Sequence, residues 1–229
     1  MPLPRFSTLD EPRRRAILGA AAEEFGEKGF AAASYNRVIE RAGISKGAMY
    51  YYFADKDDLF RTLLESAVAQ WVVQVMQPFD VKDADGFWAT CQTIYERSLR
   101  FMLADRTNAA ICLCITRSRE RREDHAALVE LQRQMEHWTN EIIRSGRSVG
   151  AVRDDIPPEL LLQVALSMMD AGDRWLASRW GEFKPEDVAS TAKTMVDLFK
   201  RVGAPLHVLT GTDLAATPGR GARKKKDQG

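Results

Sequence analysis

Proline placement divides this 229-residue chain into long proline-free intervals. The nine prolines lie at positions 2, 4, 12, 78, 157, 158, 185, 205 and 218, so residues 13–77, 79–156, 159–184 and 186–204 contain none. Because proline breaks a helix interior, these intervals are where helices can form. Within them apolar residues recur at helical spacing, as at Ile17, Ala21 and Phe25, and no segment shows the alternation of a strand. The sequence predicts an all-α protein.

The composition is that of an ordinary globular protein, with 45% hydrophobic and 28% charged residues and a formal net charge of +1. A chain of this length can bury roughly 70–75% of its unfolded surface, so it needs no covalent or metal staple. The odd number of cysteines, three, argues against a disulfide framework. The opening MPLPRFSTLDEPRRR lacks the apolar stretch of a signal peptide, and no apolar run approaches the roughly 20 residues that cross a bilayer. We expect a cytoplasmic protein without a membrane partner.

Residues 34–53 carry the start and stop signals of two short helices joined by a tight turn. Ser34 is a good N-cap for the first helix, and Gly43 can end it in the left-handed conformation. Ser45 can cap a second helix that runs from Lys46 to about Tyr52. Such a pair forms a helix-turn-helix, whose second helix enters the major groove of DNA by its N-terminal residues. The alternative is two core helices with the tyrosines packed inside.

The second helix carries residue types suited to DNA. Lys46 adds a charge at a helix N-terminus, where free backbone N–H groups favour a phosphate. Gly47 is a poor helix former and permits close approach to a DNA backbone. Tyr50 and Tyr51 can donate hydrogen bonds to phosphates while their rings pack on sugars. Residues 34–54 hold three basic residues and one acid, a local net charge of +2 that suits specific binding.

Three motifs follow one another along residues 12–60: F-G-E-K-G-F at the end of a first helix, then A-G-I-S-K-G-A-M-Y-Y-Y-F, then D-K-D-D-L-F. This stretch resembles the DNA-binding domain of the TetR/AcrR family of bacterial transcriptional regulators. A weaker resemblance lies in G-A-V-R-D-D-I-P-P-E-L-L-L at 150–162. The resemblance implies three DNA-binding helices at the N-terminus and about nine helices in total. It also implies a homodimer through the last two long helices and a small-molecule pocket in the C-terminal domain.

Carried over position by position, the resemblance predicts that DNA is contacted by Ser34, Tyr35, Arg37, Ser45, Lys46, Gly47, Ala48, Tyr50, Tyr51 and Lys56. Of these, Lys46 and Ala48 are expected to face base edges. The two tyrosines of the second helix and Lys56 are expected to hold phosphates. Arg37 and Tyr35 depart from the residues usual in the family, and we expect them to influence the choice of operator.

The expected organisation has four parts. Residues 1–11 form a flexible arm, residues 12–56 the DNA-binding domain with its helix-turn-helix at about 34–53, and residues 57–204 a helical sensor and dimerisation domain. Residues 205–229 are predicted to be a disordered basic tail, because glycine, threonine and charge replace large apolar residues there.

Aromatic residues of the C-terminal half are candidates for the lining of an effector pocket. They are Trp71, Trp88, Tyr95, Phe101, Trp138 and Trp175, with Phe87 and Trp180 also considered. Aromatic residues at helical spacing more often belong to the core, and this alternative holds for most of them. The sequence does not identify the ligand.

Catalytic and metal-binding patterns are absent from the sequence. Cys112 and Cys114 are about 200° apart on a helix, and no further cysteine pair or nearby histidine completes a zinc site. Small buried hydrophobes are the favoured interpretation of both thiols, with a redox sensor as the alternative. The chain has no P-loop, no G-x-G-x-x-G after a strand and no G-x-S-x-G. We therefore expect no enzyme, no metal and no cofactor.

The residues and the resemblance together predict a sequence-specific transcriptional regulator. A homodimer would bind a near-palindromic double-stranded operator, and a small-molecule effector would release it, which favours a repressor. Two alternatives remain: a helical small-molecule binder without operator recognition, and a regulator that senses redox state through Cys112 or Cys114.

Overall fold

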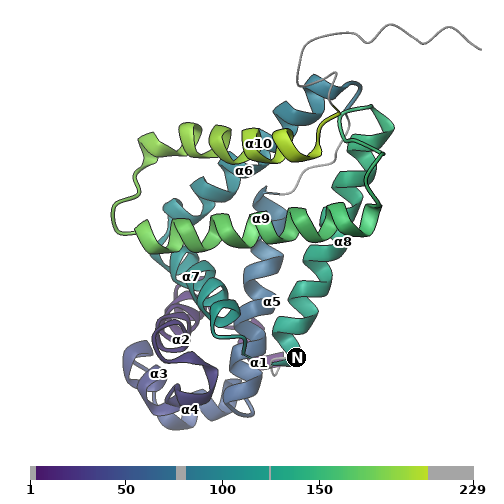
Figure 1. The fold of residues 1–229 in the computed structure, drawn as a ribbon. Coiled ribbons are helices and arrows are strands. Elements are labelled where there is room, and N and C mark those ends of the chain that lie inside the picture. Colours follow the sequence, from purple (N-terminus) through teal and green to yellow (C-terminus); the bar gives the residue numbers. More distant parts are fainter. Residues whose placement is uncertain (1–3, 76–80, 124, 206–229) are drawn as a thin grey trace, which may run out of the picture.

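The computed structural model describes residues 4–75, 81–123 and 125–205, which form helices joined by loops, with no strand among them (Figure 1). The helices are α1 (Pro4–Ser7), α2 (Glu11–Ala32), α3 (Tyr35–Ala42), α4 (Lys46–Tyr52), α5 (Lys56–Val75), α6 (Ala84–Ala104), α7 (Arg106–Glu120), α8 (Ala126–Ser148), α9 (Pro158–Arg179) and α10 (Val188–Gly203), with a 3-10 turn, η1 (Pro185–Asp187), before α10. The all-α prediction is confirmed. Ten α-helices replace the expected nine or so because α1 was not anticipated.

Helix α1 lies within the segment that was expected to be a flexible arm. Phe6 is only 4% exposed, and its ring packs 4.8 Å from that of Phe53 at the end of α4. Burying one phenylalanine contributes about 1.5–3 kcal/mol, which offsets much of the entropy lost in ordering one turn. Residues 4–7 are therefore part of the folded head, while residues 1–3 and, apart from Pro205, the predicted basic tail lie outside the described residues.

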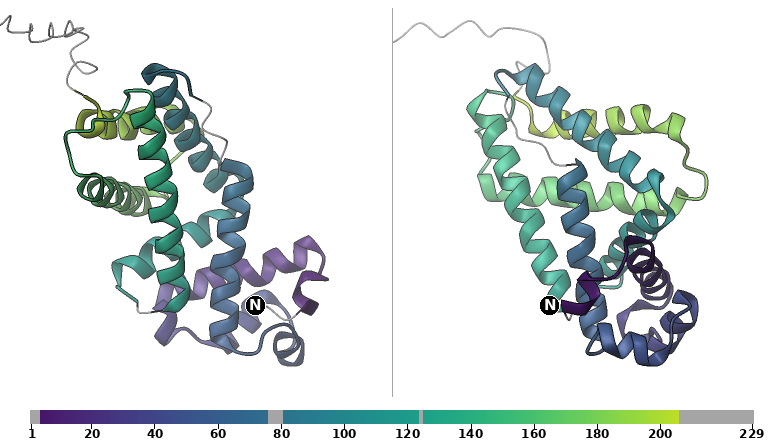
Figure 2. Two further views of the ribbon diagram at one scale, coloured as in Figure 1. Left: turned by 90° about the vertical axis from the view of Figure 1, so that its right-hand side faces the viewer. Right: turned by 180° about the vertical axis from the view of Figure 1, so that it is seen from behind.

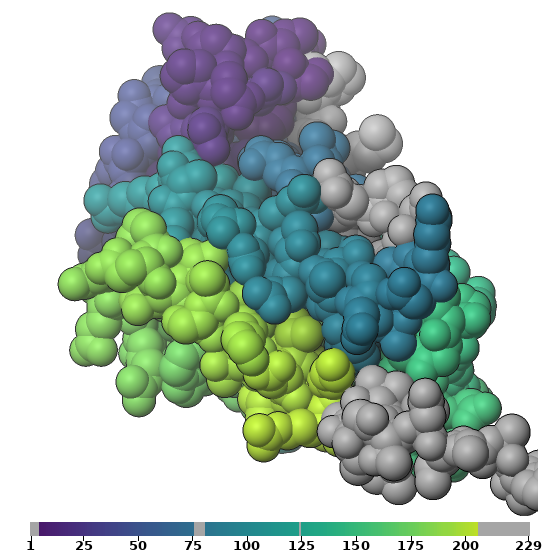
Figure 3. All heavy atoms as spheres, turned by 90° about the horizontal axis from the view of Figure 1, so that it is seen from above, coloured from purple at the N-terminus to yellow at the C-terminus, as the bar shows by residue number. Residues whose placement is uncertain are grey.

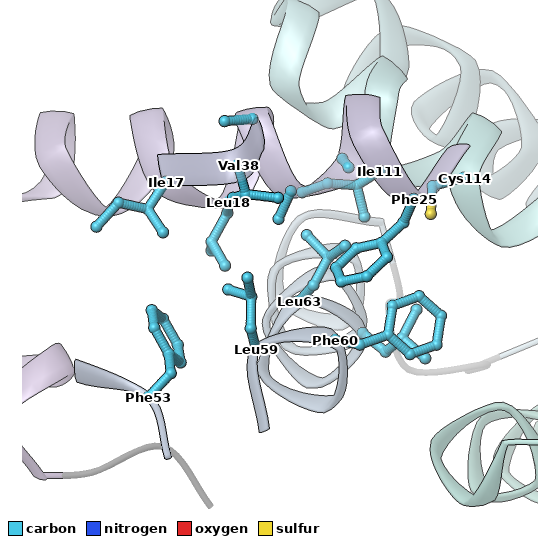
Figure 4. Packing of buried hydrophobic residues seen from close by; sticks show 14 of the residues in the cluster. Ile17, Leu18, Phe25, Val38, Phe53, Leu59, Phe60, Leu63, Ile111 and Cys114 are labelled. Atoms are coloured by element: carbon cyan, nitrogen blue, oxygen red, sulfur yellow. The ribbon is translucent and has the colours of Figure 1, made fainter. Parts of the chain in front are cut away.

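Helices α1–α4 and the first half of α5 form one end of the molecule, which we call the head (Figure 1). Its core contains Phe25, whose ring lies 4.8 Å from that of Phe60, together with Ile17, Val38, Phe53, Leu59 and Leu63 (Figure 4). Ile111 and Cys114 of α7 enter the same core beside Phe25. Helix α7 belongs to the other part of the molecule, which consists of the second half of α5 and α6–α10 and keeps the name sensor below. The head and the sensor therefore share buried apolar contacts.

Helix α2 contains a kink that sets the geometry of the head. Asp10 caps its start by accepting a hydrogen bond from the Arg13 N–H at 2.9 Å. At Gly29 the backbone turns to φ +79° and ψ 162°, which only glycine adopts without strain. Four residues, 30–33, then follow before Ser34 caps α3. The F-G-E-K-G-F motif, which the sequence analysis placed at the end of the first helix, contains this glycine.

Helix α5 runs from the head into the sensor, where α6, α7 and α8 surround it and α9 and α10 cross the far end (Figures 1 and 2). The sensor has its own apolar clusters, one around Phe87, Trp88 and Val196, and a second around Leu99 and Leu176. No described helix is long and apolar enough to cross a membrane.

Candidate DNA interface and ligand cavity

Serine caps start both helices of the α3–α4 pair. Ser34 Oγ accepts a hydrogen bond from the Arg37 N–H at 3.4 Å, and Ser45 Oγ accepts one from the Ala48 N–H at 3.1 Å. Gly43 ends α3 at φ +65° and ψ 30°, the left-handed conformation that glycine adopts most readily. A two-residue link then leads into α4, so the pair forms a helix-turn-helix.

The buried carboxylate of Glu24 anchors α3 to α2. Its Oε1 accepts the backbone N–H of Ser34 at 3.0 Å, and its Oε2 lies 3.6 Å from Arg41. Arg41 also donates to Glu27 at 3.0 Å, and this contact lowers the pKa of the Glu27 carboxyl. Arg41 is therefore neutralised within the head, so the local positive charge rests on Arg37 and Lys46.

The outer face of α4 presents two large residues that the rest of the head covers only in part. Tyr50 and Tyr51 are each 50% exposed, although both are large rings. Lys46 is exposed, with its Nζ 6.0 Å from the Tyr50 ring centroid. A Cβ at Gly47 would find no atom closer than 4.0 Å, so packing inside the protein does not require glycine there. This open glycine and the exposed tyrosines are suited to a closely approaching DNA backbone.

Arg5 belongs to the same surface, and the sequence analysis did not single it out. Its guanidinium lies 4.4 Å from the centroid of the Tyr51 ring, because Phe6 fixes α1 against α4. The signal in the sequence was Phe6, the one aromatic residue among the first ten, which was too little to predict a helix. Arg5 adds a positive charge beside the tyrosines.

Other predicted contacts have a structural role in the head. Tyr35 packs against Tyr50 with ring centroids 5.4 Å apart, and its buried hydroxyl has no hydrogen-bond partner. Burial raises the pKa of the Tyr35 phenol, with a smaller contribution from Tyr50. The side-chain oxygens of Ser34 and Ser45 are used as caps. The structure thus places Tyr35 beneath the exposed face rather than on it.

The ammonium group of Lys56 is hydrogen-bonded within the head. Its Nζ donates to three carbonyl oxygens at the end of α2, at 2.8–3.2 Å (Phe30, Ala31 and Ala33). An ammonium group has three donors, so all of them are used. The charge also lies 4.8 Å from the Phe30 ring centroid. In the structure this side chain caps the chain between α2 and α3, and a phosphate contact of Lys56 stays a prediction.

Replacing Lys56 should reveal this structural role. We expect Lys56→Met to lower the free energy of unfolding by about 2 kcal/mol and the melting temperature by about 4–8 °C, because three carbonyls lose a charged donor. Lys46→Ala, at a residue expected to face base edges, should leave the melting temperature nearly unchanged and lower the affinity for the operator. Thermal unfolding and operator binding of both variants would check this; equal melting temperatures would contradict the capping role.

A cavity of about 330 Å³ lies among α5–α10 of the sensor. Five of the six predicted pocket residues line it: Trp71, Trp88, Tyr95, Phe101 and Trp138. The volume lies in the range of small-molecule sites, and the walls are mostly apolar. These aromatic residues are thus brought together around a space as well as serving as core.

Trp175 is the exception among the predicted pocket residues. Its side chain does not line the cavity and is 43% exposed on α9, with the Arg179 guanidinium 5.5 Å from its ring centroid. On α9 the cavity is reached by Met168, Asp173 and Leu176, which point to another side of the helix. Helical spacing could not distinguish these faces because apolar residues occur nearly all round α9.

A charged pair lies at one part of the cavity wall. Arg119 of α7 approaches Asp173 of α9, with Nη1 3.7 Å from Oδ2. Asp173 is surrounded by protein atoms, yet 44% of its side-chain surface is uncovered, because that surface faces the cavity. Desolvation raises the pKa of the Asp173 carboxyl from 3.8 to about 6, against the opposing effect of Arg119.

Asp173 should therefore reduce the stability of the ligand-free protein at neutral pH. Its folded pKa exceeds its unfolded value, so the cost is absent below about pH 3.8, grows as pH rises towards 6 and is constant above. After allowing for screening in the open cavity, we expect Asp173→Asn to raise the free energy of unfolding by about 1 kcal/mol at pH 7.5 and hardly at all at pH 4. Denaturant unfolding at both pH values would measure this, and a less stable Asn variant at pH 7.5 would contradict it.

The three thiols are in environments that suppress reactivity. Burial raises the pKa of Cys91, Cys112 and Cys114 to about 12 in each case. A redox sensor needs an accessible thiolate, so the structure does not favour this alternative. No group of three or more potential metal ligands occurs among the described residues.

Two side chains of the turn after α7 form hydrogen bonds with the backbone of α2, one before and one after its kink. Arg121 donates to the carbonyl oxygens that precede the kink, at 3.0–3.3 Å (Phe25, Gly26 and Glu27). Glu123 Oε1 accepts the N–H of Phe30 just after the kink, at 3.0 Å. A Cβ at Gly29 would lie 2.5 Å from that oxygen, so glycine is needed for clearance as well as for its φ angle. We call Arg121 and Glu123 the clamp.

A helix-turn-helix head that shares its core with a helical domain enclosing a ligand-sized cavity defines the architecture of a one-component DNA-binding regulator. Residues 17–63 match the family described as bacterial regulatory proteins, tetR family, and residues 92–200 match the tetracyclin repressor-like C-terminal domain. The chain belongs to the TetR family of transcriptional regulators, which are DNA-binding proteins and not enzymes.

Relatives and solved structures agree with this assignment. The transcriptional repressor AcnR of Corynebacterium diphtheriae is 27% identical over 174 residues, covering 72% of this chain and 82% of its own. A TetR family regulator from Chloroflexus aurantiacus superposes with a TM-score of 0.66 at 19% identity, over 90% of this chain and 99% of its own. The regulator FadR of Bacillus subtilis, solved in complex with stearoyl-CoA, gives a TM-score of 0.63 at 16% identity, over 80% and 96%.

Proposed function

We propose that this regulator is a homodimeric repressor, released from a near-palindromic operator when a small molecule enters the sensor cavity. The observation that carries the proposal is that α7 connects the two sites. Cys112, Thr116 and Arg119 of α7 line the cavity, and Arg121 lies two residues beyond Arg119 in the clamp. That AcnR is a named repressor supports the sign of regulation.

The clamp offers a physical route from ligand to DNA. A ligand that displaces Arg119 moves the end of α7, and the clamp transmits this movement to the kink of α2. The kink leads directly to Ser34, whose N–H and cap fix the start of α3. Reorienting α3 and α4 changes the distance between the two heads of a dimer. The two copies of α4 then no longer match half-sites about 34–36 Å apart. The ligand must bind the DNA-incompetent state more tightly, because otherwise it shifts nothing.

On the DNA side, the exposed face of α4 supports a division of roles. Lys46 and Ala48, at the N-terminal end of α4, are assigned to base edges, and Arg37 of α3 lies exposed on the neighbouring helix. The hydroxyls of Tyr50 and Tyr51 are assigned to phosphates, and Arg5 joins them as a further phosphate contact.

The proposed dimer interface lies on α9 and α10. Leu160 and Trp175 of α9 and Leu198 and Val202 of α10 are 36–55% exposed, which is unusual for large apolar side chains. In Figure 3 the yellow-green α10 lies on the outside of the molecule with no other segment over it in that view. A self-complementary apolar surface on these helices suits a two-fold dimer.

Introducing negative charges on this surface by substitution should separate the subunits. We expect Leu160→Glu combined with Trp175→Glu to give monomers at micromolar concentration, because each carboxylate would be buried unpaired in the interface. Sedimentation velocity would measure the change from dimer to monomer, and operator affinity should fall because the two heads are no longer linked. Val129→Glu, at a 61% exposed position on α8, is the matched control and should remain dimeric. A double variant that stays dimeric would place the interface elsewhere.

Transcription in vitro tests the sign of regulation. A template with the protein's selected operator placed across a promoter should give less transcript as protein is added, and Lys46→Ala should restore it. More transcript in the presence of protein would show an activator instead.

A further inference from the structure

Several polar side chains on the cavity wall already have hydrogen-bond partners within the protein, whereas Trp88 Nε1 is buried without one. Trp71 Nε1 donates to Ser98 Oγ at 2.7 Å. The hydroxyls of Thr116 and Thr139 donate to carbonyl oxygens one turn earlier in their own helices, at 3.2 and 2.7 Å. These groups have little capacity left to select a ligand.

Arg119 and Asp173 differ from the rest of the lining in their charge. They are the only charged residues on the cavity wall in the part of the chain that the structure describes. Their 3.7 Å separation exceeds a hydrogen bond, and neither side chain makes a hydrogen bond with another described residue. Arg119 thus keeps five free N–H donors and Asp173 its acceptor sites, all at the edge of an apolar space. The two side chains are 30% and 44% exposed, so these donors and acceptors are open to a molecule in the cavity.

The charges around this pair balance. Asp170 and Arg174, the ionic neighbours of Asp173 on α9, form a salt bridge with each other. Tyr95 of α6 is uncharged at neutral pH, and its hydroxyl lies near α9, where a Cβ at Gly172 would be 3.4 Å from it. The cavity wall therefore presents one donor cation and one acceptor anion, with no net charge.

We propose that the effector is an uncharged, mostly apolar molecule whose carboxamide-type head accepts a hydrogen bond from Arg119 and donates one to Asp173. This proposal rests on the cavity being the effector site. A carboxamide holds its oxygen and its N–H side by side, which matches a donor and an acceptor 3.7 Å apart. Both charged residues gain the partner they lack.

Charged heads fit the same place less well. A carboxylate attracted to Arg119 is repelled by Asp173 at nearly the same distance, and an ammonium group meets the reverse. Either ion loses its hydration on entering an apolar cavity without a net electrostatic gain in return. The uncharged amide loses less hydration free energy on entering the cavity and forms hydrogen bonds with both residues.

The apolar remainder of the ligand would lie against the aromatic wall. Trp71 and Trp138 pack with ring centroids 5.7 Å apart, and Trp88 and Phe101 line further parts of the cavity. A compact hydrocarbon body is therefore suited to the space. Three of the wall residues are tryptophans, so binding can be followed by their emission.

The experiment compares three probes with one body: adamantane-1-carboxamide, adamantane-1-carboxylate and 1-adamantylammonium, which do not absorb where tryptophan does. Binding to the full chain is measured at pH 7.5 without DNA, by tryptophan emission and by calorimetry. We expect the carboxamide to bind at least about tenfold more tightly than either ion, a difference of about 1.4 kcal/mol.

Two variants change the charge of the wall in opposite directions. Asp173→Asn leaves Arg119 unopposed and should move the preference to the carboxylate, whereas Arg119→Met leaves Asp173 unopposed and should move it to the ammonium ion. A residue that only supported the fold would weaken all three probes alike. Retained binding of the newly preferred ion also shows that each variant is folded.

Several results would overturn the proposal: a wild-type preference for either ion, an order of affinities that both variants leave unchanged, or no binding of any probe. Failure of the proposed function is separately visible, because these affinities are measured without DNA. Carboxamide selectivity in a protein that selects no operator would contradict the regulatory role and leave the ligand class standing.

Discussion

Removing the hydroxyls of Tyr50 and Tyr51 together should weaken operator binding by about 100-fold. Each head would lose two phosphate contacts, and four contacts per dimer at about 0.7 kcal/mol each amount to about 2.8 kcal/mol. The Tyr50→Phe, Tyr51→Phe protein keeps both rings, so the packing on Tyr35 and beneath Arg5 is preserved. Because the lost groups are uncharged, the salt dependence of binding should change little. Fluorescence anisotropy over a range of salt concentrations measures both quantities.

Tyr35→Phe is the matched control for this experiment. Its hydroxyl is buried without a partner, so removing it should leave operator affinity unchanged and raise the free energy of unfolding by about 1 kcal/mol. If Tyr35→Phe weakened binding as much as the double variant, the hydroxyl would reach DNA and the arrangement of α3 and α4 described above would be wrong.

Arg121→Ala should alter the head although Arg121 belongs to the sensor. The last carbonyls before the kink of α2 would lose their donor, which makes that end of the helix easier to open. We expect backbone amides of residues 25–35 to exchange with deuterium about 30-fold faster, corresponding to about 2 kcal/mol of local stability. Operator affinity should fall about tenfold, because the start of α3 is less well fixed. Hydrogen exchange by mass spectrometry and anisotropy would measure the two effects.

Arg106→Ala provides a control from the same helix. Arg106 also joins α7 to α2, through an ion pair of 3.2 Å with Glu23, but its side chain is 90% exposed. Exposed ion pairs contribute little, so neither exchange nor affinity should change. Equal effects of the two substitutions would mean that the clamp has no special role in holding the kink.

The head was predictable from sequence because its signals are local. Ser34, Gly43 and Ser45 determine where α3 and α4 start and end through contacts within three or four residues. The exposure of Tyr50 and Tyr51 follows from the position of Met49, which points inward and is fully buried. Periodicity within one helix is enough to separate these two sides.

Contacts between residues distant in sequence could not be predicted. The resemblance assigned Lys56 to a phosphate and did not indicate its partners in the structure, the carbonyls of residues 30–33, over twenty residues earlier. The clamp depends on contacts across more than ninety residues. No local pattern in a single sequence marks such pairs.

The lining of the cavity could be predicted from the sequence only in part. Aromatic composition indicated which residues could line a pocket, and five of six do. Trp175 was misplaced because α9 is apolar on more than one side, and only the positions of α7, α8 and α10, which pack on α9, decide which side is enclosed. The Arg119–Asp173 pair joins helices more than fifty residues apart, so spacing could not reveal it.

Selection from a random pool of DNA duplexes tests the central claim most directly, since it does not depend on knowing where the operator lies. The purified full-length protein is incubated with the pool in excess competitor, and bound duplexes are amplified and sequenced over several rounds. The account predicts convergence on a near-palindromic sequence with two half-sites about one helical turn apart, and no convergence for Lys46→Ala combined with Tyr50→Phe. A pool that stays random, with weak binding that salt abolishes equally for every duplex, would contradict operator recognition by this head.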